Sequence, residues 1–152
     1  MAKFRFELDP VLRARQREED VIQRDVARLQ RQRTILEDGL RNRQVRLSES
    51  KRSVRDQLVG TIETSNVRMQ ATASLAIMRD AERTVLELAG IHQRLEEARS
   101  KLREAAKRRR AIELLREQRV EEWRRNEARA EQLALDELAV IRAARTNQEE
   151  IL

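Results

Sequence analysis

Apolar side chains recur at alternating intervals of three and four residues along most of this chain. A first series runs from Leu8 to Val54, and a second runs from Met78 to Leu102. This spacing places the side chains in one narrow stripe along a helix, and such a stripe is stable only when another helix covers it. The pattern therefore predicts long helices that pair as a coiled coil.

Polar residues interrupt both expected stripes, and Arg or Glu stands at several positions that a coiled coil usually gives to Leu. We expect the first stripe to contain Leu8, Leu12, Arg15, Glu19, Ile22, Val26, Leu29, Arg33, Leu36, Leu40, Arg43, Leu47, Ser50 and Val54. We expect the second to contain Met78, Ala81, Val85, Leu88, His92, Leu95, Arg99 and Leu102.

The composition agrees with a thin helical structure. Charged residues make up 39% of the 152 residues, aromatic residues 2%, and Gly and Pro together number four. A globular domain of this length would close a wider core around aromatic side chains. We therefore predict an all-α fold, a long antiparallel two-helix coiled-coil hairpin that forms a single domain over residues 1–152.

The expected helix boundaries follow from capping and from short polar side chains. Asp9 can cap a helix, and Pro10 suits the first helical turn, so the first helix should span about 10–59. Residues 60–74 are rich in Gly, Ser, Thr and Asn, which compete with helical hydrogen bonding, and we expect a break there. The second helix should span about 75–144, with residues 146–152 frayed.

A short connection makes two long helices antiparallel if they pair within one chain. If the chain reverses near Asn66, residue i faces approximately residue 132 − i. Leu29 then lies near Leu102, Leu8 lies near Trp123, and the residues from Leu133 onward extend past the pairing. A bundle formed by several chains is the structural alternative.

The sequence offers little for catalysis. There is no Cys, and His92 is the one His, without a compact acidic cluster beside it. Three isolated Gly residues do not make a phosphate-binding loop. We therefore predict that the chain is not an enzyme and that it holds no cofactor or metal. No apolar run approaches the ~20 residues that span a bilayer, so we expect a cytoplasmic protein.

A net charge of +6 allows an acidic protein surface or a nucleic acid as a partner. The densest basic run is residues 107–110, whose side chains point around most of a helix and form no flat phosphate-binding face. Few aromatic residues are present for base stacking. We therefore expect no nucleic-acid partner, although a basic helical nucleic-acid-associated protein stays open as an alternative.

The two ends of the chain carry motifs that resemble a known family. The run Phe6-Glu7-Leu8-Asp9-Pro10-Val11-Leu12, followed by Arg15, is similar to the opening of the flagellar export protein FliJ family. The run Leu135-Asp136-Glu137-Leu138-Ala139 is similar to the family's C-terminal signature. The charged heptads and the length agree as well, so the resemblance covers nearly the whole chain. The turn region lacks the aromatic residues of some members, which affects any contact made there.

The resemblance implies a two-helix stalk similar to the gamma subunit of rotary ATPases. Such a stalk binds the export ATPase FliI in its central pore, promotes the activity of the ring, and links it to the export gate protein FlhA. Export chaperones are further implied partners. The chain would then be a monomer on its own, cytoplasmic, and peripheral at the inner membrane through the export gate.

We hypothesise that the open end of the hairpin binds the ATPase ring and that the turn end binds the export gate. The expected ring-binding residues are Phe4, Phe6, Leu8, Val11, Leu12, Trp123, Leu133, Leu135, Asp136, Glu137 and Leu138. The expected gate-binding residues are Leu75, Met78, Ala81 and Val85. A generic coiled-coil tether or homodimeric scaffold, and the equivalent stalk of a virulence injectisome, are the remaining alternatives.

Overall fold

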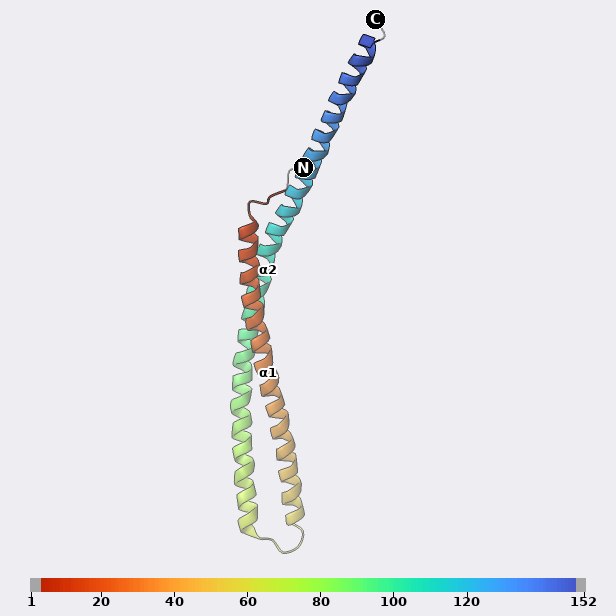
Figure 1. The fold of residues 1–152 in the computed structure, drawn as a ribbon. Coiled ribbons are helices and arrows are strands. Elements are labelled where there is room, and N and C mark those ends of the chain that lie inside the picture. The colour runs from red at the N-terminus through yellow and green to blue at the C-terminus, as the bar shows by residue number, and fades with distance from the viewer. Residues whose placement is uncertain (1–3, 150–152) are drawn as a thin grey trace. The chain divides into compact units, whose positions relative to one another are not determined.

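The computed structural model describes residues 4–149, which form two helices and no strand. Helix α1 spans Asp9–Gln57 and helix α2 spans Thr64–Glu149 (Figure 1). The all-α class and the helical hairpin are confirmed. Packing divides the chain into two compact units, although we predicted a single domain. We call Glu18–Glu104 the turn unit, and Met1–Arg17 with Ala105–Leu152 the arm unit.

Helix α1 begins one residue before the predicted position. The Asp9 amide donates to the Phe6 carbonyl at 3.2 Å, and the Leu12 amide donates to the Leu8 carbonyl at 2.9 Å. The Asp9 carboxylate accepts a hydrogen bond from Arg13, one turn further on, at 2.9 Å. An acidic side chain in the first turn also interacts favourably with the helix dipole. These contacts define the start of α1 and turn the preceding residues away from the helix axis.

The connection between the helices is shorter than predicted and spans residues 58–63. Gly60 has φ of +106°, a conformation that side chains other than glycine rarely adopt. Helix α2 begins at Thr64, where we expected a break that continues to residue 74. The Asn66 side chain donates to the Glu63 carboxylate at 2.7 Å, which stabilises the first turn of α2.

Several short polar side chains between residues 64 and 74 are compatible with helix because they find partners. The Thr72 hydroxyl donates to the Arg68 carbonyl at 2.9 Å within α2. Ser74 pairs with Ser50 of α1 at 2.9 Å. At its other end α2 continues to Glu149, whereas we predicted a second helix that ends near residue 144 and frays from 146, and residues 150–152 lie outside the described part.

The observed register differs from the predicted one by about two helical turns. Ser50 lies against Ser74, and the Gln70 side chain donates to Ser53 at 3.1 Å. The residue numbers in these two pairs add to 124 and 123, whereas the prediction was about 132. The shift follows from the early start of α2, which centres the reversal near residue 62. The predicted pairing of Leu29 with Leu102 is therefore replaced by packing of Leu29 with Leu95.

The stripe predicted on α1 is confirmed along its whole length. Leu12, Val26 and Leu29 are buried, and every other predicted position is at least partly buried. In the turn unit, Val26 and Leu29 pack with Leu95 and Ala98 of α2 in one apolar cluster. Burial of these side chains supplies the main hydrophobic stabilisation of the hairpin.

The stripe predicted on α2 is half right. Ala81, Leu88, Leu95 and Leu102 are buried or partly buried, as expected. The positions between them lie one residue earlier than predicted. The buried or partly buried residues are Ile77, Thr84, Ile91 and Ala98, whereas Met78, Val85 and His92 are exposed and Arg99 is partly exposed. The observed stripe keeps the imidazole of His92 and the guanidinium of Arg99 out of the contact between the helices. Burying such a polar group without a partner is unfavourable.

Thr84 is the one polar residue that is fully buried in the described part of the chain. Its side chain is 5% exposed, and its hydroxyl donates to the Asp80 carbonyl at 2.9 Å. The hydrogen bond lies within α2, so Thr84 occupies the helix contact without an unsatisfied donor.

Candidate partner-binding surfaces

Residues 4–8 form a non-helical arm that packs against α2 inside the arm unit. Phe4, Phe6 and Leu8 are partly buried, whereas the intervening Arg5 and Glu7 are exposed. This alternation gives the arm an apolar side, which lies against Leu115 and Trp123 of α2.

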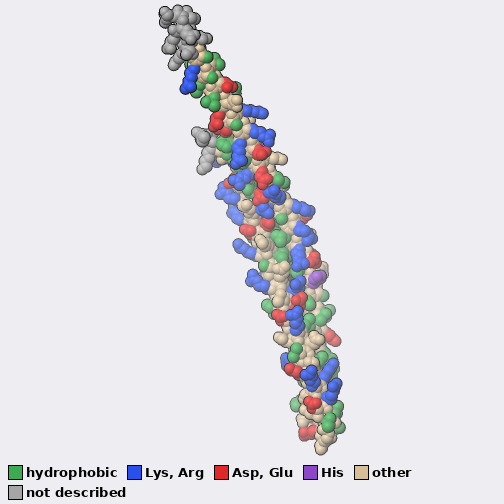
Figure 2. Space-filling view, turned by 90° about the vertical axis from the view of Figure 1, so that its right-hand side faces the viewer, with side chains coloured by type: hydrophobic (Ala, Val, Ile, Leu, Met, Phe, Trp, Pro, Cys, Tyr) green, Lys and Arg blue, Asp and Glu red, His purple; other side chains and the backbone are tan. Residues whose placement is uncertain are grey.

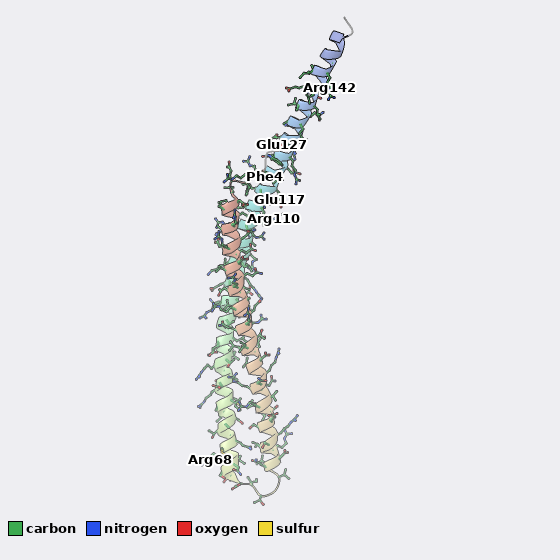
Figure 3. The ribbon with its side chains drawn as sticks, viewed as in Figure 1. Phe4, Arg68, Arg110, Glu117, Glu127 and Arg142 are labelled. Atoms are coloured by element: carbon green, nitrogen blue, oxygen red, sulfur yellow. The ribbon has the colours of Figure 1, made fainter. Side chains whose placement is uncertain are left out.

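The Phe4 ring lies on Trp123, with ring centroids 5.9 Å apart and planes tilted by 55°. Figure 3 shows Phe4 beside the part of α2 that carries Glu117. A tilted aromatic pair at this distance is favourable. A hollow beside the pair is bordered by Leu115 and Asn126. Leu8 and Trp123, which we predicted to lie near each other, both line this hollow.

Two other predicted ring-binding residues differ in their access to a partner. Val11 is exposed, whereas Leu12 is only 4% exposed. Leu12 therefore packs inside the hairpin and offers no surface to another protein.

Beyond Trp123, α2 continues with exposed apolar side chains. Leu133, Leu135 and Leu138 are 64%, 65% and 52% exposed, and the intervening Asp136 and Glu137 are exposed as well. Figure 3 shows this part of α2 between Glu127 and Arg142 with side chains pointing outward. We call residues 128–143 the extension. Every residue of the extension is exposed.

Two exposed apolar residues of the extension lie outside the predicted ring-binding set. Val140 is exposed beside Ile141, and both add to the apolar surface of the leucines. A count of large apolar residues past Trp123, made without a heptad assumption, would have found Val140. Contiguous exposed apolar surface of this kind marks interaction sites.

The predicted gate-binding residues lie on α2 in the turn unit and divide between two environments. Leu75, Met78 and Val85 are exposed. Ala81 is partly buried in the contact with α1, so it contributes little to an outer surface. Leu86 is also exposed and was missed, because it lies outside the predicted stripe.

Two arginines of the basic run are engaged within α2 itself. Arg109 binds the Glu113 carboxylate at 2.6 Å, and Arg110 binds Glu113 at 3.4 Å and Glu117 at 3.0 Å. Lys107 and Arg108 also have partners. Residues 107–110 are therefore all engaged in polar contacts, which leaves little of their charge unpaired for a phosphate partner.

Glu113 has a pKa below its usual value of 4.5. The hydrogen bond from Arg109 is the main cause, and the positive charges of Arg109 and Arg110 add to it, whereas desolvation acts in the opposite direction.

Charged side chains of both signs are mixed on the face that Figure 2 shows, where basic and acidic side chains are interspersed among apolar ones.

Comparison with known proteins identifies the family. The sequence matches the family described as flagellar FliJ protein over residues 4–148. The chain belongs to the FliJ family. The resemblance seen in the sequence is confirmed, and the chain is accordingly a component of flagellar type III export, in a family without catalytic function. No curated protein matches the sequence.

A solved structure supports the fold assigned to this FliJ family member. CT670 of Chlamydia trachomatis, a proposed YscO homolog, superposes with a TM-score of 0.57 and is 19% identical in sequence. The match covers 96% of this chain and 99% of CT670. Among residues 4–149, neither helix has a segment apolar enough to cross a membrane.

Proposed function

We propose that this chain is the non-catalytic stalk of the flagellar export ATPase complex. It binds the export ATPase FliI through the arm unit and the export gate protein FlhA through the turn unit. The observation that carries the proposal is the exposed apolar surface of the extension in a member of the FliJ family. Leu133, Leu135 and Leu138 are each more than half exposed, which favours a partner over solvent.

The ATPase contact combines apolar and charged groups. The extension supplies its leucines, and Asp136 and Glu137 add carboxylates between them. The arm supplies Phe4 and Phe6, and Val11 continues the apolar surface onto α1. Two helices side by side are about 20 Å across, which suits insertion into a protein ring.

The experiment for the ATPase contact replaces Leu133 and Leu138 together by Ser. Purified FliI should lose binding to this variant and should lose ATPase stimulation by it, because the apolar anchor is removed. The control replaces Gln132 and Ala139 by Ser, at exposed positions of the same helix. Full ATPase stimulation by the double leucine variant would show that the extension is not the ATPase contact.

The gate contact uses the exposed apolar residues near the turn. Met78 and Val85 are one heptad apart and lie on the same side of α2. Replacing both by Glu should abolish binding to the cytoplasmic part of FlhA and leave FliI binding intact. The variant with Ser at positions 133 and 138 should lose FliI binding and keep FlhA binding. If both variants lose both partners, the assignment of one partner to each unit is wrong.

The chain covers its own apolar stripe within the turn unit, so it needs no second copy there. We therefore propose a monomer before assembly, which sedimentation equilibrium tests. The proposal places the chain in the cytoplasm, at the inner membrane only through the export gate, with export chaperones as further partners. Co-purification with FliI, FlhA or a chaperone checks each partner separately.

A further inference from the structure

One side of the turn unit carries a continuous groove between α1 and α2. Two hollows lie along this side, and Gln32 and Arg94 border both of them, so they join. The floor is apolar and includes Leu29, Ile91 and Ala98. We call this the Gly90 groove after the glycine on its border. It belongs to neither of the surfaces assigned to FliI and FlhA above.

Exposed β-branched side chains mark both ends of the groove. Val21 and Ile35 line it from α1 and are 63% and 69% exposed. They are separated by four helical turns, or about 21 Å. This length matches a helical segment of about 14 residues.

Gly90 lies on the α2 side of the groove and leaves space there for a side chain of a partner. A Cβ atom built at Gly90 would meet no atom within 4 Å. A side chain from a partner can therefore enter beside Gly90 and contact Ile35, which lines the same hollow. Close approach of another chain is a common reason for glycine on a helix surface.

Three of the four basic side chains that border the groove lack partners. Arg24, Arg94 and Lys101 line it, and none of them makes an ion pair or a side-chain hydrogen bond within residues 4–149. Charged groups of a partner could therefore bind them without breaking an existing contact. The arrangement favours a partner with carboxylates.

Acidic side chains on the same border are mostly engaged. Asp25 binds Arg28, and Glu97 accepts a hydrogen bond from the Gln93 side chain at 3.3 Å. Glu87 is the remaining carboxylate on the border. Glu97 and Glu87 have no cationic partner, so three cations without an ion pair stand beside two such carboxylates, which leaves a net excess of one positive charge along the groove.

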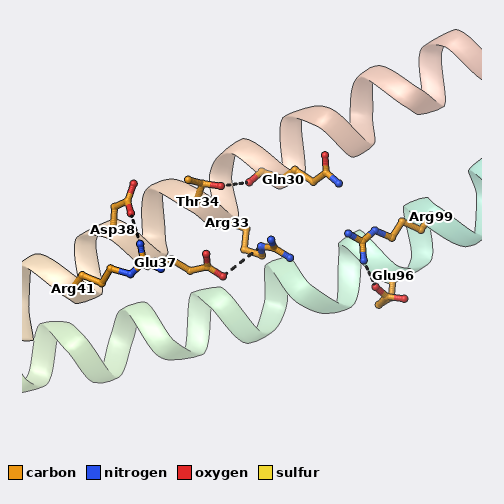
Figure 4. Close-up of polar contacts among 8 residues, drawn as sticks. All are labelled: Gln30, Arg33, Thr34, Glu37, Asp38, Arg41, Glu96 and Arg99. Atoms are coloured by element: carbon orange, nitrogen blue, oxygen red, sulfur yellow. Dashed lines mark hydrogen bonds and ion pairs between the residues drawn. The ribbon is translucent and has the colours of Figure 1, made fainter.

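Nearby arginines that do not line the groove behave differently. Arg33 interacts with Glu37 at 3.4 Å, and Arg99 binds Glu96 at 2.8 Å (Figure 4). The helices therefore supply carboxylates to these arginines and not to Arg24 or Arg94. Arg24 and Arg94 are therefore available to carboxylates of a partner.

We propose that the Gly90 groove binds an acidic amphipathic helix of a partner protein. Its apolar face would pack between Val21 and Ile35, with one side chain beside Gly90. Its Asp and Glu residues would bind Arg94 and Lys101. Docking of an apolar helix face into a hydrophobic groove is a common mode of recognition, and flanking charges select the partner. The proposal does not depend on FliI or FlhA.

The probes are two labelled synthetic helical peptides of about 16 residues with the same leucine stripe. One carries Glu on both flanks of the stripe, and the other carries Lys. Fluorescence anisotropy should show the acidic peptide binding at least about tenfold more tightly, a difference of about 1.4 kcal/mol. The binding should weaken at higher salt because exposed charges are screened.

Two variants test the groove itself. Gly90→Leu fills the space beside Gly90, and R94E reverses a charge on the border. Each should weaken acidic-peptide binding by at least about tenfold. The matched controls are Ala89→Leu and R103E, at exposed positions that do not line the groove. Thermal unfolding followed by circular dichroism checks that all four variants remain folded.

Several results would overturn the proposal. These are equal binding of the two peptides, equal weakening by the control variants, and absence of binding at about 1 mM peptide. A peptide of residues 127–143 from this chain tests a second copy as the occupant. Tighter binding of that peptide than of the designed acidic one would replace the proposed partner by a second copy.

Discussion

The hydroxyl oxygens of Ser50 in α1 and Ser74 in α2 lie 2.9 Å apart, across the contact between the helices. This pair sets the level at which the helices meet near the turn. Arg43 and Asp80 interact across the same contact at 3.8 Å, two turns further from the reversal. Polar contacts therefore help to hold the register in this part of the turn unit, beside partly buried apolar side chains such as Leu47 and Ile77. Polar residues at such positions fix register at a cost in stability.

A double-mutant cycle at Ser50 and Ser74 measures this contact. Either single change to Ala should destabilise the hairpin by about 1 kcal/mol, because it leaves one partly buried hydroxyl without its partner. The double variant should lose less than the sum of the single losses, because no unpaired hydroxyl remains. Urea unfolding gives the free energies. Strict additivity would show that the two hydroxyls do not interact.

The two exposed glycines Gly60 and Gly90 should respond to Ala in opposite directions. Gly60→Ala should destabilise the hairpin by about 1 kcal/mol or more, because φ of +106° is unfavourable for a residue with Cβ. Gly90→Ala should stabilise it by up to about 1 kcal/mol, because Gly90 is helical with free space around it. Thermal unfolding of both variants checks the sign of each change.

The sequence predicted α1 better than α2, and particular residues explain why. On α1, Leu29 and Leu47 each lie between two polar residues, so only one stripe fits there. On α2, Met78 follows Ile77 and Val85 follows Thr84, so two adjacent stripes fit the spacing. Tertiary packing selects the stripe that keeps charged groups in solvent, which spacing alone does not reveal.

The position of the turn and the Gly90 groove could not be predicted from the sequence, because both follow from contacts between the two helices. The polar residues near Ser74 favour a break locally, but their hydrogen bonds to α1 and to the α2 backbone stabilise a helix. Because the connection was placed too late, the predicted register was displaced. The juxtaposition of Ile35 and Gly90 follows from the observed register, so the Gly90 groove was not predictable. The arm was predictable, since Phe4 and Phe6 alternate with polar residues.

Truncation of Leu95 should be among the most destabilising changes in the turn unit. Leu95 is fully buried, and replacing a buried Leu by Ala costs about 2–5 kcal/mol. Leu86→Ala is the matched control, because Leu86 is exposed and its loss should change stability by about 0.5 kcal/mol or less. Urea unfolding compares the two. Similar losses for both would contradict the observed stripe on α2.

Glu113 should contribute to acid sensitivity of the arm unit. Its pKa is lower in the folded chain than in the unfolded chain, so its contribution is fully present above the unfolded value near 4.5. The contribution is lost as the pH falls through the lowered folded value. In the Glu113→Gln variant, the free energy of unfolding should therefore depend less on pH below 4.5. NMR titration of the Glu113 carboxyl carbon measures the pKa directly, and a value above 4.5 would contradict the ion pairs with Arg109 and Arg110.

The contact between Phe4 and Trp123 can be followed by fluorescence, because Trp123 is the one Trp and the sequence has no Tyr. Phe4→Ala removes the ring that covers the indole, so the emission of Trp123 should shift to longer wavelength as water reaches it. The aromatic pair itself contributes about 0.5–1.5 kcal/mol, and acrylamide should quench the variant more strongly. Arg5→Ala is the control, since Arg5 is an exposed neighbour in the same arm. Unchanged emission and quenching in the Phe4 variant would show that the arm does not pack on α2 in solution.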